Sequence, residues 1–502
     1  MSNGLKPLRP LQVTALEMLR DVIRSGARRP MLQASTGFGK TVLAAHIIAG
    51  VRQRNKRVAF CVPALGLVNQ SFSRFVENGL PAVEMGVMQG DHPWRRPHAP
   101  IQIATAQTLQ RRALPNVDVA VLDEAHELHE VYRRWMEESP QTLFIGLSAT
   151  PWSRGLGLRF DRLVKPTNLR ELIDQGYLSK FRVYAPSHPD LTSVKVVAGD
   201  YHEGQLGEVM SKPKLVADIV STWLTMGAGR PTLCYAVNLH HARLLHDRFA
   251  EAGVRVAYVD ANTPGEERDV IGRRLAAGEI QVAVNVGTLT RGIDWDVRCI
   301  ILARPTRSEM LFVQIIGRGL RTAVGKDDCL ILDHSDTHQK LGMVTDIDHA
   351  ALDMGEKLSK KEKQAKQQEQ PLPTCCPSCS ALMPPGSRAC GSCGSTLPLI
   401  DPVIGVAGEL VELGNGNKAA TTSEKWLAQQ PRREIYAQLL SIRIERQYLP
   451  VWVDRAFKDI FGVWPRGLGA VEPYPASQIL KSWIRERAKA FAKRKKAEEA
   501  AA

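Results

Sequence analysis

The stretch MLQASTGFGKTVLAAHIIAG, residues 31–50, changes its hydrophobic pattern half-way along. It starts as a short apolar run, turns through two glycines and continues with apolar residues at helical spacing. A glycine turn between a strand and a helix leaves the first N–H groups of the helix free to hold an anion, and a lysine after the turn adds positive charge. The stretch therefore predicts a phosphate-binding loop.

The loop departs from the strict pattern G-x-x-x-x-G-K-[ST] at its first position, where Ala34 replaces glycine. Gly37 and Gly39 keep the tight turn, while Lys40 and Thr41 supply the ammonium and the hydroxyl that contact phosphates and Mg²⁺. An ordinary glycine turn is the alternative, and this stretch alone leaves it open. A nucleotide site needs support from residues elsewhere in the chain.

Short apolar runs alternate with helical patterns from about residue 31 to 150, and again from about residue 230 to 335. Such alternation predicts an α/β fold with two tandem parallel-sheet units, each sheet covered on both faces. We expect residues 1–167 to form the first domain, 168–229 a connector or insertion, 230–349 the second domain, 350–373 a charged linker, 374–398 a cysteine module and 399–502 a small helical region.

The composition fits a globular chain of several domains, with 502 residues, 44% hydrophobic and 24% charged. No apolar run is long enough to span a bilayer, and the N-terminus shows no secretory signal, so we expect a cytoplasmic protein without a membrane partner. The net charge of +14 favours a polyanion such as nucleic acid as the partner, although a generally basic proteome would also explain it.

Residues 119–126, VAVLDEAH, form an apolar run that ends in two acids, Asp123 and Glu124. At the end of a strand that faces a phosphate loop, the first acid can hold Mg²⁺ and the second can deprotonate the attacking water. Two solvated acids at the start of a helix are the alternative, which the wholly apolar strand disfavours. His126 and His129 are spaced i,i+3 and do not match the zinc helix H-E-x-x-H.

The second unit contains QIIGRGLR, residues 314–321, at the end of a helical pattern. Phosphoryl transfer gains from cations that neutralise charge on the γ-phosphate, and such arginines can come from a neighbouring domain. Arg318 and Arg321 are therefore candidate arginine fingers, which would place ATP between the two units.

The segments ASTGFGKT (34–41), DEAH (123–126), SAT (148–150), TRGIDWD (290–296) and QIIGRGLR (314–321) resemble, in this order, the motifs of superfamily 2 helicases. The resemblance implies two RecA-like domains that hydrolyse ATP with Mg²⁺, and in this superfamily the first position of the loop is commonly alanine or glycine. It also implies further roles. Arg9 and Gln12 would recognise adenine, while Lys40, Thr41 and Asp123 would bind phosphates and Mg²⁺. Glu124 would be the catalytic base, and Ser148 and Thr150 would couple hydrolysis to movement. The second domain would contribute Gly292, Asp294 and Gln314 to the ATP site.

Residues 62–70 and 103–109 resemble the strand-contacting motifs of the superfamily, but each is also explained as a strand-to-helix turn. Asn238 and His241 are equally open, because they would either face the nucleic acid or cap a helix.

The nine cysteines divide into two groups. Cys61, Cys234, Cys299 and Cys329 lie in apolar runs and predict small hydrophobic side chains on buried strands. Cys376, Cys379, Cys390 and Cys393 form two C-x-x-C pairs, which predict a tetrahedral Zn²⁺ site in a zinc ribbon; a redox dithiol is the alternative. Cys375 would replace Cys376 in another register. The metal would be structural, and the ribbon would recognise nucleic acid or a protein.

The helicase segments followed by four cysteines look most like the RadD-like branch of bacterial and phage DNA helicases, densely from Leu8 to Asp336 and poorly from Pro402 onward. The last residues form a basic tail with aromatic side chains, which suits phosphates and bases or is simply a solvated end. The tail contains Lys481, Trp483, Arg485, Arg487, Lys489, Phe491, Lys493, Arg494, Lys495 and Lys496.

We expect an ATP-dependent DNA helicase or translocase that acts in repair, recombination or replication on single-stranded or branched DNA. The alternatives are a double-strand translocase or DNA-stimulated ATPase that separates no strands, an RNA helicase, which the motif wording disfavours, and a recruitment module that binds a repair or single-strand-binding protein through the ribbon and tail.

Overall fold

The computed structural model describes residues 4–127, 129–290, 294–356, 372–396, 426–468 and 470–499. The chain divides into two compact units, Met1–Ile400 and Asp401–Ala502. Each unit is described separately below.

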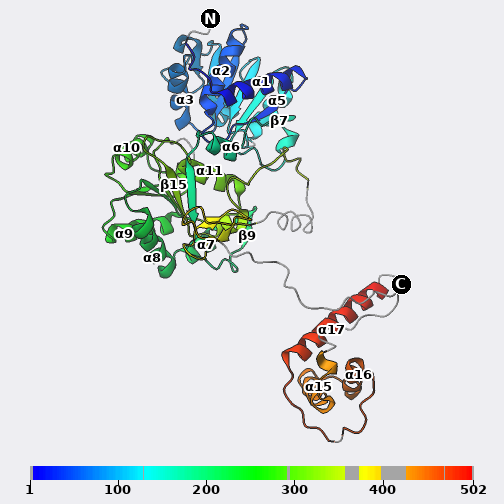
Figure 1. Cartoon of the computed structure of the whole chain (residues 1–502). Coiled ribbons are helices and arrows are strands. Elements are labelled where there is room, and N and C mark those ends of the chain that lie inside the picture. The colour runs from blue at the N-terminus through cyan, green and yellow to red at the C-terminus, as the bar shows by residue number, and fades with distance from the viewer. Residues whose placement is uncertain are drawn as a thin grey trace. The chain divides into compact units, whose positions relative to one another are not determined.

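The first domain is built on a seven-stranded sheet in which all paired strands are parallel (Figure 1). In spatial order its strands are β3 (Met85–Val87), β4 (Ile101–Thr105), β2 (Val58–Val62), β5 (Val119–Asp123), β6 (Leu143–Ser148), β1 (Pro30–Gln33) and β7 (Arg162–Val164). The five inner strands follow the predicted apolar runs. The edge strands β3 and β7 have only three residues each, too few for an alternating or continuous pattern to show in the sequence.

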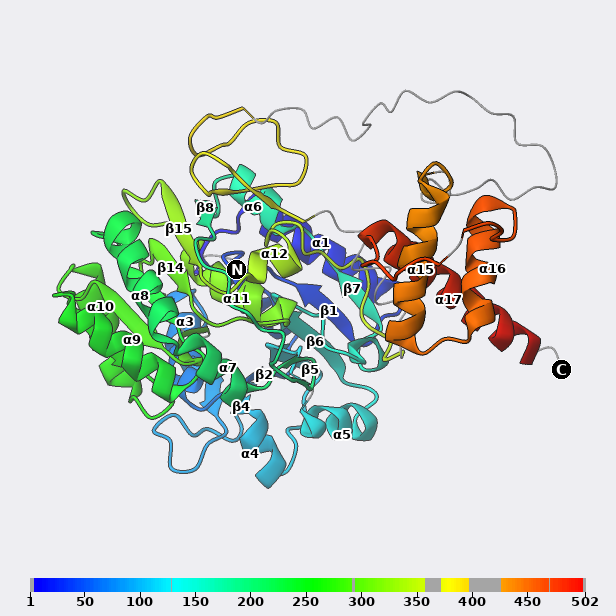
Figure 2. The ribbon, with the colours of Figure 1, turned by 90° about the horizontal axis from the view of Figure 1, so that it is seen from below.

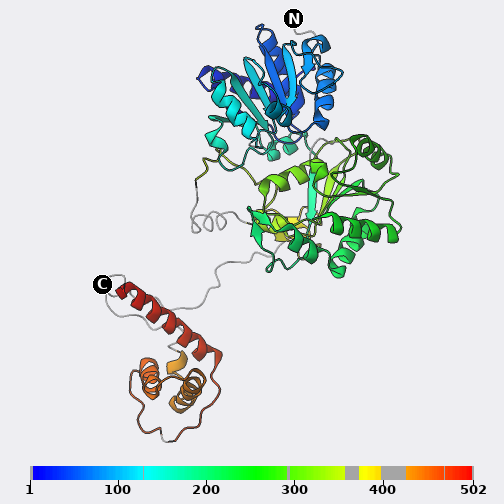
Figure 3. The same cartoon turned by 180° about the vertical axis from the view of Figure 1, so that it is seen from behind.

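Helices cover both faces of this sheet, as the apolar strands predict (Figures 1 and 3). One face carries α1 (Pro10–Arg24), α2 (Lys40–Arg52) and α3 (Gly66–Glu77), and the other carries α4 (Ala106–Arg111) and α5 (Glu130–Glu138). Phe60 of β2 contacts Phe75 of α3 at 4.8 Å between ring centroids, whereas Trp135 of α5 contacts Phe144 of β6 at 5.3 Å. Short 3₁₀ turns lie at Ala82–Glu84 and Leu156–Leu158.

The second domain has a six-stranded sheet, again with parallel pairs throughout. Its spatial order is β12 (Val256–Val259), β13 (Val282–Asn285), β11 (Thr232–Tyr235), β14 (Cys299–Leu302), β15 (Asp328–Asp333) and β8 (Lys180–Tyr184). The helices α8 (Pro213–Thr222) and α9 (Leu239–Glu251) pack on one face of this sheet. The other face carries α10 (Gly265–Ala276) and α11 (Glu309–Gly319). The short helix α12 (Thr337–Leu341) follows β15. A 3₁₀ turn spans Thr288–Thr290. The prediction of two RecA-like parallel-sheet domains is confirmed.

The segment 168–229, expected as a connector or insertion, contributes directly to the second domain. It contains α6 (Leu169–Asp174), strand β8, a hairpin of β9 (Val196–Val197) and β10 (Asp200–Tyr201), α7 (Glu203–Met210), α8 and a π-helical turn (Trp223–Gly227). Because β8 pairs with β15, part of this segment is an edge strand of the second sheet. The domain boundaries stay predictions, and this pairing favours an earlier start of the second domain.

The cysteine module lies against this same edge of the sheet (Figure 2). Its two short antiparallel strands are β16 (Thr374–Cys375) and β17 (Leu382–Met383), and an antiparallel bridge links Tyr184 of β8 to Ala381. The four other cysteines are buried on β2, β11, β14 and β15, which confirms their prediction as core residues.

The described part of the second unit includes the helices α15 (Arg432–Arg446), α16 (Pro450–Phe461) and α17 (Gln478–Glu499) (Figure 3). Its core joins Leu439 of α15, Phe457 of α16 and Trp483 of α17. Within the described residues, no helix has both the length and the apolar character needed to cross a membrane. Residues 357–371 of the expected linker, residues 397–425 and the tail side chains from Lys489 onward lie outside the described part.

Candidate nucleotide site and four-cysteine cluster

The predicted phosphate loop lies between the carboxyl end of β1 and the first turn of α2. Gly37 and Gly39 have φ values of 80° and 88°, in the left-handed region that favours glycine. A Cβ on Gly39 would lie 2.5 Å from Nε2 of Gln12, and one on Gly37 would lie 2.4 Å from Cδ2 of Leu178. The backbone conformation therefore favours glycine at both positions, and an added Cβ would also displace the ends of the Gln12 and Leu178 side chains.

Ala34 continues the strand instead of forming the turn. Its N–H donates to the carbonyl oxygen of Ser148 at 2.8 Å, and its φ is not positive. Its methyl group is fully buried in the core of the domain. The departure from the strict glycine pattern therefore falls where the backbone conformation suits an alanine.

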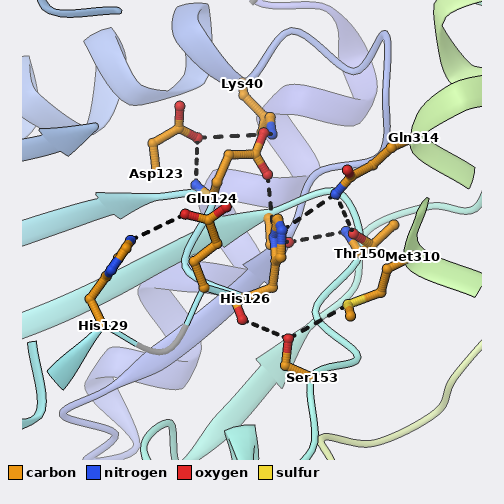
Figure 4. Close-up of polar contacts among 11 residues, drawn as sticks. Lys40, Asp123, Glu124, His126, His129, Thr150, Ser153, Met310 and Gln314 are labelled. Atoms are coloured by element: carbon orange, nitrogen blue, oxygen red, sulfur yellow. Dashed lines mark hydrogen bonds and ion pairs between the residues drawn. The ribbon is translucent and has the colours of Figure 1, made fainter. Parts of the chain in front are cut away.

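The acid pair comes to the loop because β5 and β1 flank β6 in register, so their carboxyl ends lie at one edge of the sheet. Lys40 forms an ion pair with Glu124, and its Nζ lies 3.9 Å from Oδ1 of Asp123 (Figure 4). Glu124 has a positive φ of 47°, a strained conformation for a side-chain-bearing residue, which turns the chain sharply after the strand.

The two acids have opposite pKa shifts. Burial raises the pKa of Asp123 to about 6, with a further rise from the charge of Glu124, while Lys40 opposes it. For Glu124, burial favours the neutral form, but the charges of Lys40, His126 and Arg318 together hold its pKa below the usual value. Oε2 of Glu124 is buried and accepts no hydrogen bond within the described structure, although it lies 3.4 Å from Nδ1 of His126. The site thus keeps Glu124 ionised, and Oε2 has room in its hydrogen bonding for a water molecule or the hydration shell of Mg²⁺.

A polar path leads from the acid pair into the second domain (Figure 4). Nδ1 of His126 lies 2.8 Å from Oγ of Ser148, which accepts from the N–H of Thr150 at 3.0 Å. Nε2 of Gln314, on α11, donates to Oγ1 of Thr150 at 3.3 Å and lies 3.3 Å from Nε2 of His126. The acid-pair turn, the segment after β6 and the second domain are therefore joined by consecutive hydrogen bonds.

The two candidate fingers follow Gln314 along α11 and its end. Burial, with the charge of Arg321, lowers the pKa of Arg318 to about 10, so its guanidinium stays charged at neutral pH and acts on Glu124. Arg321 donates to Asp294 at 2.5 Å, and Asp294 also lies 3.5 Å from Arg74 of the first domain. Gly292 lies outside the described residues.

Arg9 and Gln12 are both engaged with the phosphate loop. Nε2 of Gln12 donates to the carbonyl of Phe38 at 2.7 Å, and its Oε1 accepts from the N–H of Arg9 at 2.9 Å. The guanidinium of Arg9 lies 5.0 Å from the ring centroid of Tyr177. In this structure Gln12 supports the loop backbone, and its assignment to adenine stays a prediction.

The strand-contacting candidates are mostly occupied by local structure. Thr105 caps α4 by accepting from the N–H of Thr108 at 3.1 Å, and Asn238 caps α9 by accepting from the N–H of His241 at 2.9 Å. His241 is fully buried, and its Nδ1 accepts from the N–H of Val237 at 3.3 Å. Asn238 and His241 are therefore explained by the helix-capping interpretation.

The four predicted zinc ligands converge. The sulfur atoms of Cys376, Cys379, Cys390 and Cys393 all lie within 4.8 Å of one another. Cys376 and Cys393 are 3.7 Å apart at Sγ, as are Cys379 and Cys390. Sulfurs at the corners of a tetrahedron with Zn–S bonds of about 2.3 Å would be about 3.8 Å apart, so the set fits Zn²⁺.

The neighbouring Cys375 lies outside this set. It is exposed, and its Sγ accepts from Nε2 of Gln339 at 3.6 Å. The register that uses Cys376 is the one present.

Comparison with known proteins identifies the two domains. Residues 5–153 match the family described as "Type III restriction enzyme, res subunit", and residues 212–323 match the "Helicase conserved C-terminal domain". The chain belongs to the superfamily 2 helicases. The phosphate loop and the acid pair fall within the first matched range, and Gln314, Arg318 and Arg321 fall within the second.

This helicase is 30% identical over 354 residues to IRC3 of Saccharomyces cerevisiae, a candidate ATP-dependent helicase, covering 65% of the chain and 51% of IRC3. It is 27% identical to a 51.5 kDa protein of a Lactococcus phage, covering 72% of the chain and 77% of that protein. UvrABC system protein B of Anaplasma phagocytophilum is 28% identical over 206 residues, covering 39% of the chain and 26% of that protein. The helicase thus spans about half the length of IRC3.

Two solved structures share the fold. A fragment of a candidate HsdR subunit of a type I restriction enzyme from Vibrio vulnificus superimposes with a TM-score of 0.52 at 20% identity, covering 68% of this chain and 66% of that one. The Type ISP restriction-modification enzyme LlaBIII, solved bound to DNA, gives a TM-score of 0.50 at 17% identity, covering 65% and 28%. Both likenesses concern the fold alone.

Two residues contribute to the site without a role predicted from the sequence. The spacing of His126 fits no zinc helix, yet this residue links Glu124 to Ser148 and Gln314. Its place inside the DEAH motif was the available signal. Leu178 covers Gly37 from the segment after α6, and no local pattern in the sequence indicates that contact.

Proposed function

We propose that this helicase is an ATP-driven motor that moves along DNA, with ATP bound at the phosphate loop and hydrolysed beside Glu124. The observation that carries the proposal is the polar path from the acid pair through Thr150 to Gln314, because it connects the hydrolysis site to the second domain. A change at the γ-phosphate would then alter how the two domains meet.

The residues divide the work as follows. Lys40 and the N–H groups of the loop and first turn of α2 would bind the phosphates, while Thr41 and Asp123 would hold Mg²⁺, which neutralises phosphate charge. Glu124 would accept the proton of the attacking water, and the ionised state favoured by its surroundings suits that role. Arg318 and Arg321 would neutralise charge from the second domain once Arg321 leaves Asp294. Gly292 and Asp294 would line the nucleotide site from the same side.

DNA as the polymer that is bound is supported by the net charge of +14 and by the neighbour LlaBIII, which was solved bound to DNA. The finer placement in the RadD-like branch rests on the motif wording and on the four cysteines. Zn²⁺ in the ribbon fits the sulfur geometry. From the placement in the RadD-like branch we also propose action in repair, recombination or replication and a cytoplasmic location. The proposed partner is a repair protein or a single-strand-binding protein.

The decisive test measures ATP hydrolysis by the full chain without polymer and with single-stranded DNA, duplex DNA, a fork or RNA. We expect DNA to stimulate the parent, and Lys40→Ala and Glu124→Gln each to lower the stimulated rate by about 100-fold or more. Gln314→Ala should lower stimulation while nucleotide binding is kept. Wild-type rates in Lys40→Ala and Glu124→Gln would overturn the proposal. Stronger stimulation by RNA than by DNA would show that the polymer bound is RNA.

Strand separation is a further step that the ATPase assay leaves open. Two assays distinguish a helicase that separates strands from a translocase that does not. One is a strand-displacement assay on a fork, and the other is a triplex-displacement assay on duplex DNA. Displacement of both kinds supports a helicase, whereas triplex displacement alone identifies a double-strand translocase. Failure of both, with DNA binding kept, would favour the recruitment role.

A further inference from the structure

A hollow of about 210 Å³ lies in the first domain, away from the nucleotide site. It is lined by Arg57, Val87, Met88, Arg95, Pro97, Gln102, Arg112, Pro115 and Asn116. Arg57 precedes β2 and Asn116 precedes β5, so these walls belong to the amino ends of the strands. The phosphate loop follows the carboxyl end of β1, which is the opposite edge of a parallel sheet.

Three arginines from three separate segments converge on this hollow, and its lining contains no carboxylate. Within the described residues, the guanidinium groups of Arg57, Arg95 and Arg112 form no ion pair, whereas nearby Arg52 is paired with Glu84 at 2.8 Å. Like charges gathered without a counter-charge repel one another, and an anion relieves that repulsion. The planar guanidinium suits the two oxygens of a phosphate better than it suits a single point charge.

The walls that present these arginines are anchored. Nε2 of Gln102 donates to the carbonyls of Arg96 and Ala99, both at 2.8 Å, which holds the loop before β4 against the strand. A Cβ on Gly86 would lie 2.3 Å from the carbonyl oxygen of Arg96, so the loop packs directly on β3. The N–H of Arg57 donates to Asp118 at 2.8 Å. Anchored backbone lowers the conformational entropy that binding would cost.

The size of the hollow and its surroundings point to a large anion. A single water molecule needs roughly 10–15 Å³ of such volume, so the hollow admits a group of many atoms. Val87, Met88 and Pro97 add apolar wall beside the cations. Arg54 and Arg111, close in the chain to Arg57 and Arg112, are exposed as well.

We propose that this three-arginine hollow, formed by Arg57, Arg95 and Arg112, is a second DNA-binding site of the helicase that takes the phosphodiester backbone at the edge of the first domain opposite the nucleotide site. The proposal rests on the proposed function, because it assumes that DNA is the track. The hollow would contact DNA outside the motif segments. Binding of single-stranded or duplex DNA there would not depend on ATP.

The test compares the variant Arg57→Gln, Arg95→Gln, Arg112→Gln with a charge-matched control, Arg20→Gln, Lys214→Gln, Arg273→Gln, whose three positions are exposed elsewhere. Binding of labelled single-stranded and duplex oligonucleotides to the full chain is measured against NaCl concentration. Each phosphate contact contributes about 0.9 to the salt slope for duplex and about 0.7 for single strands. We expect the slope of the hollow variant to fall by about 2 for single strands and by about 3 for duplex, with at least a tenfold loss of affinity, and the control to stay within about threefold.

Comparison of the two DNA forms shows whether single-stranded or duplex DNA occupies the hollow, since the form that binds there loses more affinity in the hollow variant. Basal ATPase without DNA should be equal in all three proteins. If the parent neither binds DNA nor is stimulated by it, the proposed function itself fails. If the parent binds DNA and the hollow variant matches the control, this inference alone is overturned.

Two competitors complete the test. Oligoglutamate of equal charge should compete far more weakly than the oligonucleotide, and pyrophosphate should not displace DNA at equal phosphate concentration. Competition by oligoglutamate as strong as by DNA, lost in the hollow variant, would assign the site to an acidic peptide and overturn the proposal. Displacement by pyrophosphate would assign it to free phosphate and overturn it equally.

Discussion

At the scale of single residues, the phosphate loop shows why one glycine of the pattern is dispensable and another is essential. Ala34 belongs to the strand, where its N–H pairs with Ser148. Gly39 has a positive φ and lies so close to Gln12 that a Cβ would be 2.5 Å from its amide nitrogen. The same substitution type should therefore have very different consequences at the two positions.

We expect Ala34→Gly to leave the DNA-stimulated ATPase rate within about threefold of the parent, since the loop geometry does not depend on the methyl group. Gly39→Ala should lower that rate by about 100-fold, because it strains the turn and displaces Gln12. Steady-state ATPase assays at saturating DNA check both, with circular dichroism to show that the variants fold. Equal losses in both variants would contradict this account of the loop.

His241 provides a pH prediction at the same scale. Burial above all, with the charge of His240, lowers its pKa to about 4. The folded state therefore disfavours the proton, so the stability linked to this group is complete above the unfolded pKa of about 6.5 and is lost as the pH falls toward 4. The loss amounts to at most about 3.5 kcal/mol, since one pKa unit corresponds to about 1.36 kcal/mol.

We expect the melting temperature of the parent to fall between pH 6.5 and 4, and His241→Gln to fall less steeply over that range. The variant should be less stable at pH 7.5, because the hydrogen bond from Val237 is altered. His98→Gln, at an exposed histidine, is the control and should follow the parent. A His241→Gln curve parallel to that of the parent would show that another group causes the acid sensitivity.

At the scale of elements, the cysteine module is part of the core of the second domain. Cys376, Met383 and Cys390 belong to the same apolar cluster as Tyr184 and Leu330. The hydroxyl of Tyr184 is 2.5 Å from that of Ser392, and the module covers the edge strand β8. An uncovered edge strand exposes unpaired backbone groups, so the module stabilises the sheet whatever it also recognises.

Removal of the metal should therefore unfold more than the ribbon. We expect Cys376→Ser, or treatment with a strong chelator, to lower the melting temperature of the second domain by roughly 5–10 °C and to remove one Zn²⁺ per chain. Calorimetry and metal analysis are the measurements. Cys375→Ser, one residue away and exposed, is the matched control and should change neither quantity. Equal behaviour of the two serine variants would show that the cluster holds no structural metal.

At the scale of the whole molecule, the two compact units set where the chain can be cut. Residues up to Ile400 form one unit, which includes both sheets and the cysteine module. A chain that ends after Pro371 would keep both sheets but lose the module that packs on β8. A deletion intended to remove only recruitment functions would then also damage the motor.

We expect the chain 1–400 to keep the basal ATPase rate and the melting temperature of the first unit. The chain 1–371 should melt several degrees lower and lose ATPase activity on storage, because the apolar side chains of Tyr184 and Leu330, which pack against the module, become exposed. Calorimetry and ATPase assays on both truncations check this. If the two truncated chains were equally stable, the module would be an appendage and not a part of the core.

The local sequence determined the parts of the candidate nucleotide site and of the cysteine module, and long-range packing determined how these parts meet. The apolar runs fixed the inner strands, and the residues at their ends fixed the phosphate loop, the acid pair and the cysteine spacing, because each of these depends on neighbours within a few positions. Three-residue edge strands, the cover of Gly37 by Leu178, the path through His126 to Gln314 and the ribbon on β8 join segments far apart in the chain. Such contacts depend on which surfaces the folded sheets bring together, so only the tertiary structure decided them.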